Sequence, residues 1–207
     1  MIKDIRIIFY LVLRFLNMLK NISTLFVLFL LISTNIFSQE NKDIIPWSYD
    51  RSLTWDDFKG RVNKRSNFDA LTSASFGFNY KYLSGQYYTF IISVGFDEKS
   101  SWVKMENATD DLLKHEQGHF DINEIYARLC IKELQHVKVK NMDKFGKEVE
   151  KVFDKVNRQM MKFQDEYDKE TNHSKVKDKQ IEWNAKIENL LKETAEYKVK
   201  EMKVEFD

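Results

Sequence analysis

The pentapeptide HEQGH, from His115 to His119, has the residue types and the spacing of a helical zinc site. Residues four apart lie on one face of an α-helix, so both imidazoles can bind a single metal ion through ring nitrogens. Glu116 lies beside them, where a carboxylate can take a proton from a water that the metal acidifies. The pattern therefore predicts metal-dependent hydrolysis, with His115 and His119 as Zn²⁺ ligands and Glu116 as the catalytic base.

The residues around this pentapeptide predict a helix over about 109–135. Thr109 is a suitable N-cap, and the acidic residues that follow it favour the positive end of a helix dipole. No proline interrupts the segment. Apolar residues at helical spacing share a face with both histidines, so we expect the imidazoles to point into the protein. One buried histidine is more often a packed core residue than a ligand, but two histidines four apart with an intervening glutamate favour a metal.

A catalytic zinc site needs three protein ligands and one open position, so a third ligand must come from elsewhere. His136 and Cys130 are carried too far along the same helix, about 25 and 16 Å beyond His119. Residues 142–167 show a second helical pattern of apolar residues. If this second helix runs antiparallel to the first, about 23 residues bring the chain back to the level of His115.

The segment that returns to this level runs from Tyr167 to His173. His173 is the preferred third ligand, and Asp168 and Glu166 are the alternatives. Asp168 has a further possible role, which is to orient a ligand histidine through a hydrogen bond. The hydroxyl of Tyr167 is a candidate for stabilising a developing oxyanion, and its competing interpretation is an aromatic cap on the helix pair.

Several stretches resemble one family, the predicted secreted zinc-dependent proteases grouped as domain of unknown function 922. They are HEQGHFDINEIYAR (residues 115–128), LTWDDFKG (53–60), SWVK (101–104) and YDKETNH (167–173), followed by Trp183. The resemblance spans about residues 47–190 and implies a zinc peptidase. Ser174 stands where the resemblance leads us to expect glycine.

Composition narrows the range of partners. The chain has 207 residues with 33 basic and 32 acidic side chains, a net charge of +1, so no excess charge suggests nucleic acid. Its length and its 43% hydrophobic content suit one domain with its own core. With Cys130 as the only cysteine, an internal disulfide is impossible, and we expect its thiol to be a small buried apolar group.

Residues 1–39 predict a signal peptide, in which Leu25–Ile32 is the apolar region and Lys20 precedes it. Met18 is a possible true start, and cleavage is expected near Ser38 or Gln39. Eight strictly apolar residues are too few for a span of about twenty, so no stable membrane span is expected after cleavage. An uncleaved anchor is the alternative. The expected location is secreted or periplasmic.

Between the signal peptide and the pentapeptide, apolar and polar residues alternate, which is the period of a β-strand and not of a helix. Residues 75–82 and 88–96 alternate aromatic or aliphatic with polar side chains around a turn near Ser84 and Gly85, which predicts a β-hairpin with one aromatic face. By analogy with other enzymes that carry the H-E-x-x-H pattern, residues 87–97 are a candidate edge strand for a substrate backbone. Thr54 and Asp57 form a capping signal for a short helix.

The whole sequence predicts an α+β fold, a small antiparallel hairpin or sheet followed by a bundle of long helices. Residues 40–190 are expected to form the protease-like domain, and residues 191–207 a peripheral C-terminal helix or tail. The expected function is zinc-dependent hydrolysis of a peptide or protein substrate. The rival is a non-catalytic envelope scaffold or binding protein with a structural zinc site, which would need four protein ligands.

Overall fold

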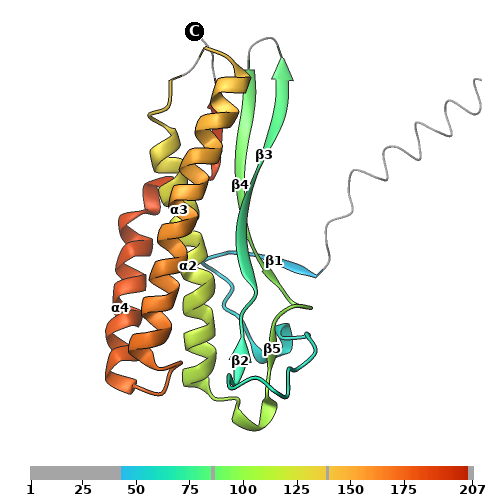
Figure 1. The fold of residues 1–207 in the computed structure, drawn as a ribbon, viewed down its shortest axis with the longest axis vertical. Coiled ribbons are helices and arrows are strands. Elements are labelled where there is room, and N and C mark those ends of the chain that lie inside the picture. Colours follow the sequence, from blue (N-terminus) through green and yellow to red (C-terminus); the bar gives the residue numbers. More distant parts are fainter. Residues whose placement is uncertain (1–42, 85–86, 139, 205–207) are drawn as a thin grey trace, which may run out of the picture. The chain divides into compact units, whose positions relative to one another are not determined.

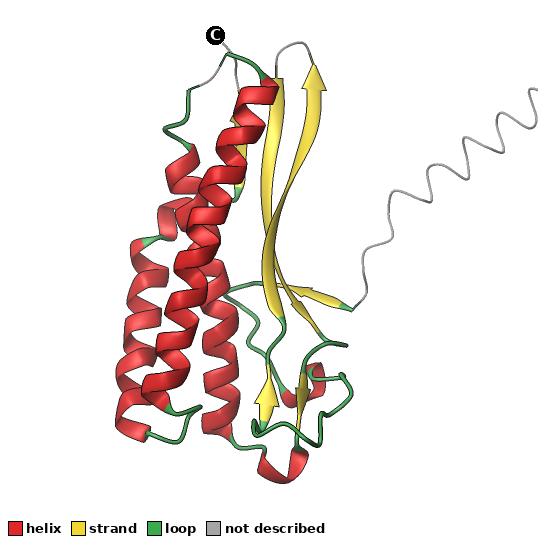
Figure 2. Ribbon diagram, viewed as in Figure 1, coloured by secondary structure: helices red, strands yellow, loops and turns green. Residues whose placement is uncertain are grey.

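The described residues of the computed structural model, 43–84, 87–138 and 140–204, form the expected α+β fold (Figures 1 and 2). In chain order the elements are β1 (Ile44–Pro46), a 3₁₀ turn (Trp55–Asp57), β2 (Ala70–Leu71), β3 (Ala74–Ser84), β4 (Tyr87–Asp97), β5 (Trp102–Val103), a 3₁₀ turn (Met105–Asn107), α2 (Asp110–Leu134), α3 (Met142–Thr171), α4 (Lys177–Glu193), a 3₁₀ turn (Ala195–Tyr197) and β6 (Glu201–Val204). Among these residues no helix combines the length and the apolar character needed to cross a membrane. The predicted signal peptide lies outside the described residues.

The predicted hairpin is present as β3 and β4, which pair antiparallel from Ala74 opposite Phe96 to Ser84 opposite Tyr87. Its turn, Gly85 and Gln86, lies outside the described residues. Aromatic side chains on its inner face meet α3, where Phe76 and Phe78 both contact Phe153 with ring centroids 5.0 and 5.1 Å apart. The strand period thus produces the apolar surface on which the helices pack.

The expectation that residues 87–97 form an edge strand is wrong. β4 pairs with β3 along one edge, while β1 and β6 pair antiparallel with its other edge. Between the parts of β4 that β1 and β6 cover, two further backbone hydrogen bonds occupy the same edge, from Trp47 N–H to the Val94 carbonyl and from Ile92 N–H to the Lys200 carbonyl. β4 is therefore an interior strand, because segments distant in sequence return to it.

The described part of the C-terminal segment also differs from the peripheral helix or tail expected over residues 191–207. α4 ends at Glu193, and the chain then turns and adds β6 to the sheet, with Tyr88 opposite Val204. Four residues are too short for a recognisable alternating pattern, so the pairing depends on β4 already being in place.

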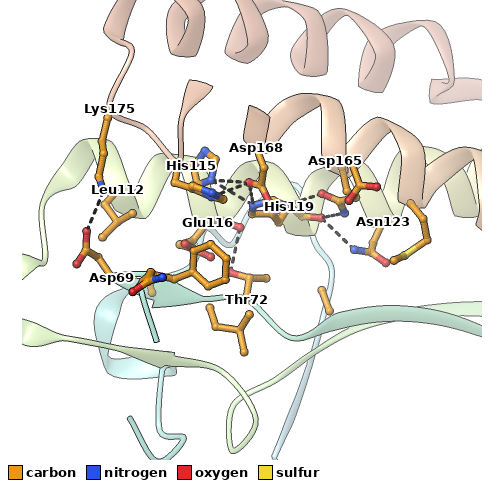
Figure 3. A pocket seen from close by; sticks show the side chains of 18 of the residues that line it. Asp69, Thr72, Leu112, His115, Glu116, His119, Asn123, Asp165, Asp168 and Lys175 are labelled. Carbon is orange, nitrogen blue, oxygen red and sulfur yellow. Dashed lines mark hydrogen bonds and ion pairs between the residues drawn. The ribbon is translucent and has the colours of Figure 1, made fainter. Parts of the chain in front are cut away.

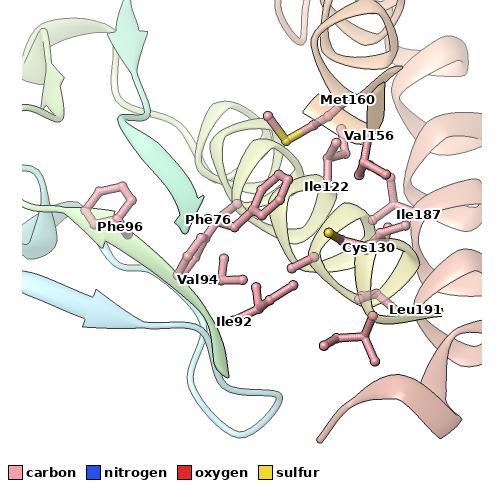
Figure 4. Packing of buried hydrophobic residues seen from close by; sticks show 14 of the residues in the cluster. Phe76, Ile92, Val94, Phe96, Ile122, Cys130, Val156, Met160, Ile187 and Leu191 are labelled. Carbon is pink, nitrogen blue, oxygen red and sulfur yellow. The ribbon is translucent and has the colours of Figure 1, made fainter. Parts of the chain in front are cut away.

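The hydrophobic core lies between the sheet and the three helices, which cover one of its faces (Figures 1 and 4). Its residues come from every layer and include Phe76, Ile92, Val94 and Phe96 of the sheet, Ile122 and Cys130 of α2, Val156 and Met160 of α3, and Ile187 and Leu191 of α4. Burying each large side chain contributes about 1.5–3 kcal/mol, so this layer of contacts fixes α2 against the sheet. Burial raises the pKa of the Cys130 thiol to about 12, with a smaller contribution from the charge of Glu133, so the cysteine is an unreactive core residue as expected.

Candidate metal centre

Helices α2 and α3 run antiparallel, as the sequence predicts, and bring the candidate ligands together. Lys155 contacts Glu133 near the C-terminal end of α2, whereas Asp168 contacts His115 near its beginning. α2 begins where predicted, with the Thr109 side chain accepting a hydrogen bond from the Leu112 N–H. α3 continues to Thr171, four residues beyond the predicted end, so Asp168 is still helical when it reaches the level of the histidines.

His115, His119 and Asp168 form a compact triangle of possible ligand atoms (Figure 3). The Nε2 atoms of the two histidines are 3.2 Å apart, and Asp168 Oδ1 lies 3.1 Å from His115 Nε2 and 3.0 Å from His119 Nε2. Tetrahedral bonds of about 2.0–2.1 Å would separate neighbouring ligand atoms by about 3.3 Å. The triangle therefore fits one small tetrahedral cation such as Zn²⁺. Among the described residues, it is the one group of three or more histidine, cysteine or acidic side chains whose ligand atoms lie close enough together to hold a metal ion.

The electrostatics of the triangle reflect the close approach of two imidazoles and a carboxylate. Burial by itself would lower the pKa of His119, but hydrogen bonding to Asp168 and the charge of Glu116 outweigh it and raise that pKa. Burial by itself would raise the pKa of Asp168, but hydrogen bonds from the two histidines and their charges lower it well below its usual range. Asp168 is therefore held as a carboxylate and the site favours a positive charge, which either a proton or a metal ion can supply.

Glu116 is 4% exposed and lines the cavity beside the triangle. Among the described residues its carboxylate has no hydrogen-bonding partner, although its backbone carbonyl accepts a bond from the Thr72 hydroxyl at 3.3 Å. A buried carboxylate without a fixed partner, facing a cavity, is available to accept a proton there. This is the position that the sequence predicts for a catalytic base.

His173 lies next to the triangle but does not join it. Its Nδ1 is 3.3 Å from Asp168 Oδ1, and its ring contacts that of Phe68 in a tilted arrangement with centroids 4.8 Å apart. Three consecutive residues, Asn172, His173 and Ser174, have positive φ values of 46°, 53° and 70°. The left-handed turn at Ser174 explains why glycine is expected there, because only glycine adopts that conformation without strain. The candidate triangle therefore contains Asp168, one of the two alternatives in the sequence prediction, and not the preferred His173.

The other two residues considered at sequence level lie away from the cavity. Glu166 is exposed and pairs with Lys162 at 3.8 Å. Tyr167 is fully buried, and its hydroxyl donates to the His115 carbonyl at 3.1 Å while accepting from Gln180 at 2.8 Å. Burial raises the pKa of this phenol. Its hydroxyl therefore does not reach a substrate, and we correct the predicted catalytic role of Tyr167 to one of packing and positioning.

Two glutamines that the sequence analysis did not select contact the outer nitrogens of the imidazoles. Gln164 Oε1 is 2.5 Å from His119 Nδ1, and Gln180 Oε1 is 3.0 Å from His115 Nδ1. Gln164 lies one helical turn before Asp168, so once Asp168 is a ligand the i, i+4 spacing identifies it. Gln180 belongs to α4, and no local pattern in the sequence connects it to the histidines.

A cavity of about 290 Å³ lies in front of the triangle and extends along α2 on both sides of it. It is lined at one end by Phe68, Asp69, Leu112 and Lys175 and at the other by Ala74, Asn123, Met160 and Asp165. Leu112 and Asn123 are eleven residues apart on α2, which corresponds to about 16 Å along the helix axis. The cavity is thus an elongated groove with the triangle near its middle (Figure 3).

Comparison with protein families identifies a match for this chain. The family model described as "Bacterial protein of unknown function (DUF922)" matches residues 47–174, which is more than half of the chain. No curated protein and no solved structure matches the chain significantly. The matched range includes the triangle and most of the groove but ends before α4.

Proposed function

Because the chain belongs to the DUF922 family, whose description assigns no activity, we propose a function from the site itself: a zinc-dependent hydrolase of peptide bonds. His115, His119 and Asp168 would hold the metal. The observation that supports this most directly is the combination of a triangle of the right size with a partnerless buried carboxylate, Glu116, on the same cavity wall. Two histidines and one acidic ligand with an open fourth position are a common ligand set of zinc hydrolases.

When bound, zinc would acidify a water molecule and polarise the scissile carbonyl. The protein supplies the remaining chemistry. Glu116 would accept the proton of the attacking water and deliver it to the leaving amine, for which a carboxylate on the cavity wall is suitably placed. Asp168 offsets part of the positive charge of the site, and the tightly packed core behind α2 keeps its histidines in one arrangement.

The groove supports a polypeptide substrate rather than a small one. It continues on both sides of the triangle, so a chain can extend in both directions from the bond to be cut. β2 pairs with β5 along one edge, and no second partner strand is present among the described residues. The Lys104 N–H bonds to the Asp69 carbonyl across that pair, so the backbone groups of Ala70 point to the other edge. We propose that β2, rather than β4, pairs with the substrate backbone.

The scaffold alternative predicts a fourth protein ligand that closes the site. In the described part of the chain, the cluster contains three candidate ligands and opens on the groove. Exposed apolar side chains, Phe68, Leu71 and Met161, also line the groove, as expected for a surface that receives side chains of a substrate. We favour hydrolysis for these reasons. The signal-like N-terminus supports export to the periplasm or medium, which sequencing the N-terminus of the exported form would test against an uncleaved anchor.

The test compares zinc content and proteolysis in three proteins: wild type, Glu116→Gln and Glu133→Gln. Wild type is expected to hold about one zinc per chain and to cut a fluorescently labelled unfolded protein. Glu116→Gln should keep the zinc and lose about 10²–10⁴-fold in rate, because it removes the base and no ligand. Glu133→Gln, on the same helix and far from the groove, should match wild type. Zinc without proteolysis would favour the scaffold, and the absence of zinc would overturn both functions.

A further inference from the structure

The contacts of Gln164 determine which nitrogen of His119 carries a proton. Gln164 Nε2 lies 3.1 Å from the backbone carbonyl of His119, and Gln164 Oε1 lies 2.5 Å from His119 Nδ1. A carbonyl oxygen can only accept a hydrogen bond, so the amide must turn its NH₂ group toward it. Gln164 Oε1 then faces the ring and must receive a proton. His119 Nδ1 therefore carries a proton.

A longer chain of hydrogen bonds gives the same result for His115. The Tyr167 hydroxyl donates its single proton to the His115 backbone carbonyl at 3.1 Å. It must then accept from Gln180 Nε2, which lies 2.8 Å away. The second Gln180 amide hydrogen goes to Asn184 Oδ1 at 2.8 Å. Gln180 Oε1 consequently faces His115 Nδ1 at 3.0 Å as an acceptor, and that nitrogen is protonated as well.

Both series of hydrogen bonds end on backbone carbonyl oxygens of α2, which can only accept. This has a consequence for the opposite side of each ring, because a neutral imidazole with a proton on Nδ1 carries its lone pair on Nε2. The two Nε2 atoms face each other and Asp168 across the triangle. Gln180 is 4% exposed and Tyr167 is fully buried, so water cannot readily replace this chain of hydrogen bonds.

We propose that Gln164 and Gln180 are positioning residues, which hold both imidazoles in the Nδ1–H form and so direct two Nε2 lone pairs at one metal ion. The proposal rests on the proposed metal function. It also assigns a role to α4, since Gln180 lies six residues beyond the region that the family model matches. The metal centre of this chain thus depends on a helix outside the matched region.

The substitutions separate proton placement from packing. Gln180→Met and Gln164→Met keep most of the side-chain volume and remove the acceptor. Gln180→Glu restores an acceptor for His115 Nδ1 while removing both donated bonds. Gln117→Met is the matched control, because Gln117 is partly buried on α2, the helix of the two histidines, and bonds to Leu53 N–H and Asp121, away from the triangle.

Two measurements are made on the full mature chain. Nitrogen–proton NMR spectra of the imidazoles, with and without zinc, report a slowly exchanging Nδ1 proton on each ring. Competition with a chelator reports zinc affinity. Wild type should show both Nδ1 protons in both states. Each Met variant at 164 or 180 should lose the slow exchange at its own histidine and bind zinc about 10–100-fold more weakly. Gln180→Glu should recover most of that affinity, and Gln117→Met should lose none.

Equal losses of affinity in Gln180→Met and Gln180→Glu would reduce Gln180 to a packing residue and overturn the proposal. Unchanged ring protons in both Met variants would overturn it too. If Gln180→Met fails to fold, the half-buried Gln164→Met still decides. A wild type that binds no zinc would defeat the proposed function, whereas the ring protons of the metal-free protein would still confirm or refute the positions of the protons.

Discussion

At the scale of single residues, the charge of the third ligand decides how the site would work. Two neutral imidazoles and the Asp168 carboxylate would leave a bound Zn²⁺ with a net charge of +1, which the neighbouring Glu116 carboxylate can approach. A third histidine would leave +2. Asp168 is strongly held as an anion, since the two histidines lower its pKa against the effect of burial. Its Oδ1 also lies 3.1 and 3.0 Å from the two Nε2 atoms, the spacing expected between neighbouring zinc ligands, so we expect it to be a direct ligand rather than a partner of one.

The first prediction concerns the identity of this ligand. Asp168→Ala should lose zinc affinity as severely as His119→Ala, because each removes one corner of the triangle. His173→Ala removes contacts to Asp168 and Phe68 but no corner of the triangle, and should cost about 10–100-fold or less in zinc affinity. His136→Ala, at the far end of α2, should bind like wild type. Chelator titrations of the four variants measure this. A severe loss in His173→Ala with affinity retained in Asp168→Ala would make His173 the ligand.

The second prediction concerns pH. In the metal-free protein the pKa of His119 is raised above its unfolded value, so the stability it contributes is complete below about pH 6.5 and is lost as pH rises through the folded pKa. Zinc must displace the same proton, so the zinc affinity should increase with pH while the stability of the metal-free protein decreases. The affinity should rise about tenfold per pH unit while one proton is released, then level off. Thermal melts and zinc titrations between about pH 6 and 9 give both curves; parallel slopes would contradict the linkage.

At the scale of elements, local sequence patterns were sufficient to predict the long helices α2 and α3 and the β3–β4 hairpin. The histidines and Glu116 belong to one helix, whose period and N-cap are encoded within 25 residues. Which residue lies beside the histidines depends on where α3 ends, and its four additional residues bring Asp168, rather than the preferred His173, into the candidate triangle. β6 and the covered edge of β4 depend on pairing between distant segments, for which no local signal exists.

The third prediction tests how closely α2 and α3 approach. An added Cβ at Gly118 would overlap the buried Tyr167 ring, 2.9 Å from its Cζ, whereas nothing lies within 4 Å of one at Gly146 in α3. Alanine has the higher helix propensity at both sites, by about 1 kcal/mol. Gly146→Ala should therefore raise the free energy of unfolding by up to about 1 kcal/mol. Gly118→Ala should lower it, since overpacking costs about 1–3 kcal/mol.

Denaturant titrations of the two alanine variants measure these changes. Gly118→Ala should also weaken zinc binding, because displacing Tyr167 disturbs the hydrogen bond that orients Gln180. A Gly118→Ala variant more stable than wild type would show that α3 can move away from α2 without cost.

At the scale of the whole described domain, the far side of α2 is anchored by a buried ionic cluster. Glu124 is fully buried and pairs with Arg128 at 2.8 Å and with Lys200 at 2.8 Å. Arg128 also donates to the Leu191 carbonyl at the end of α4, and its guanidinium lies 5.1 Å from the centroid of the Trp47 ring. The start of the domain, α4 and the segment entering β6 therefore converge behind α2, which carries the candidate ligands His115 and His119.

The last prediction compares this cluster with a surface pair of the same chemistry. Lys200→Met leaves the fully buried Glu124 with one cationic partner instead of two. Lys192→Met breaks the exposed pair of Lys192 with Glu188, in which both side chains are more than 60% accessible. A lost charged hydrogen bond in the interior costs about 1–3 kcal/mol, and an exposed helical pair only about 0.3–0.5 kcal/mol. Denaturant titration should therefore show a clearly larger loss for Lys200→Met. Hydrogen exchange should localise that loss to β6 and to the β4 residues it covers, Tyr88–Ile91. Equal effects of the two substitutions would mean that the C-terminal strand is held by its backbone pairing alone, without the ionic anchor on α2.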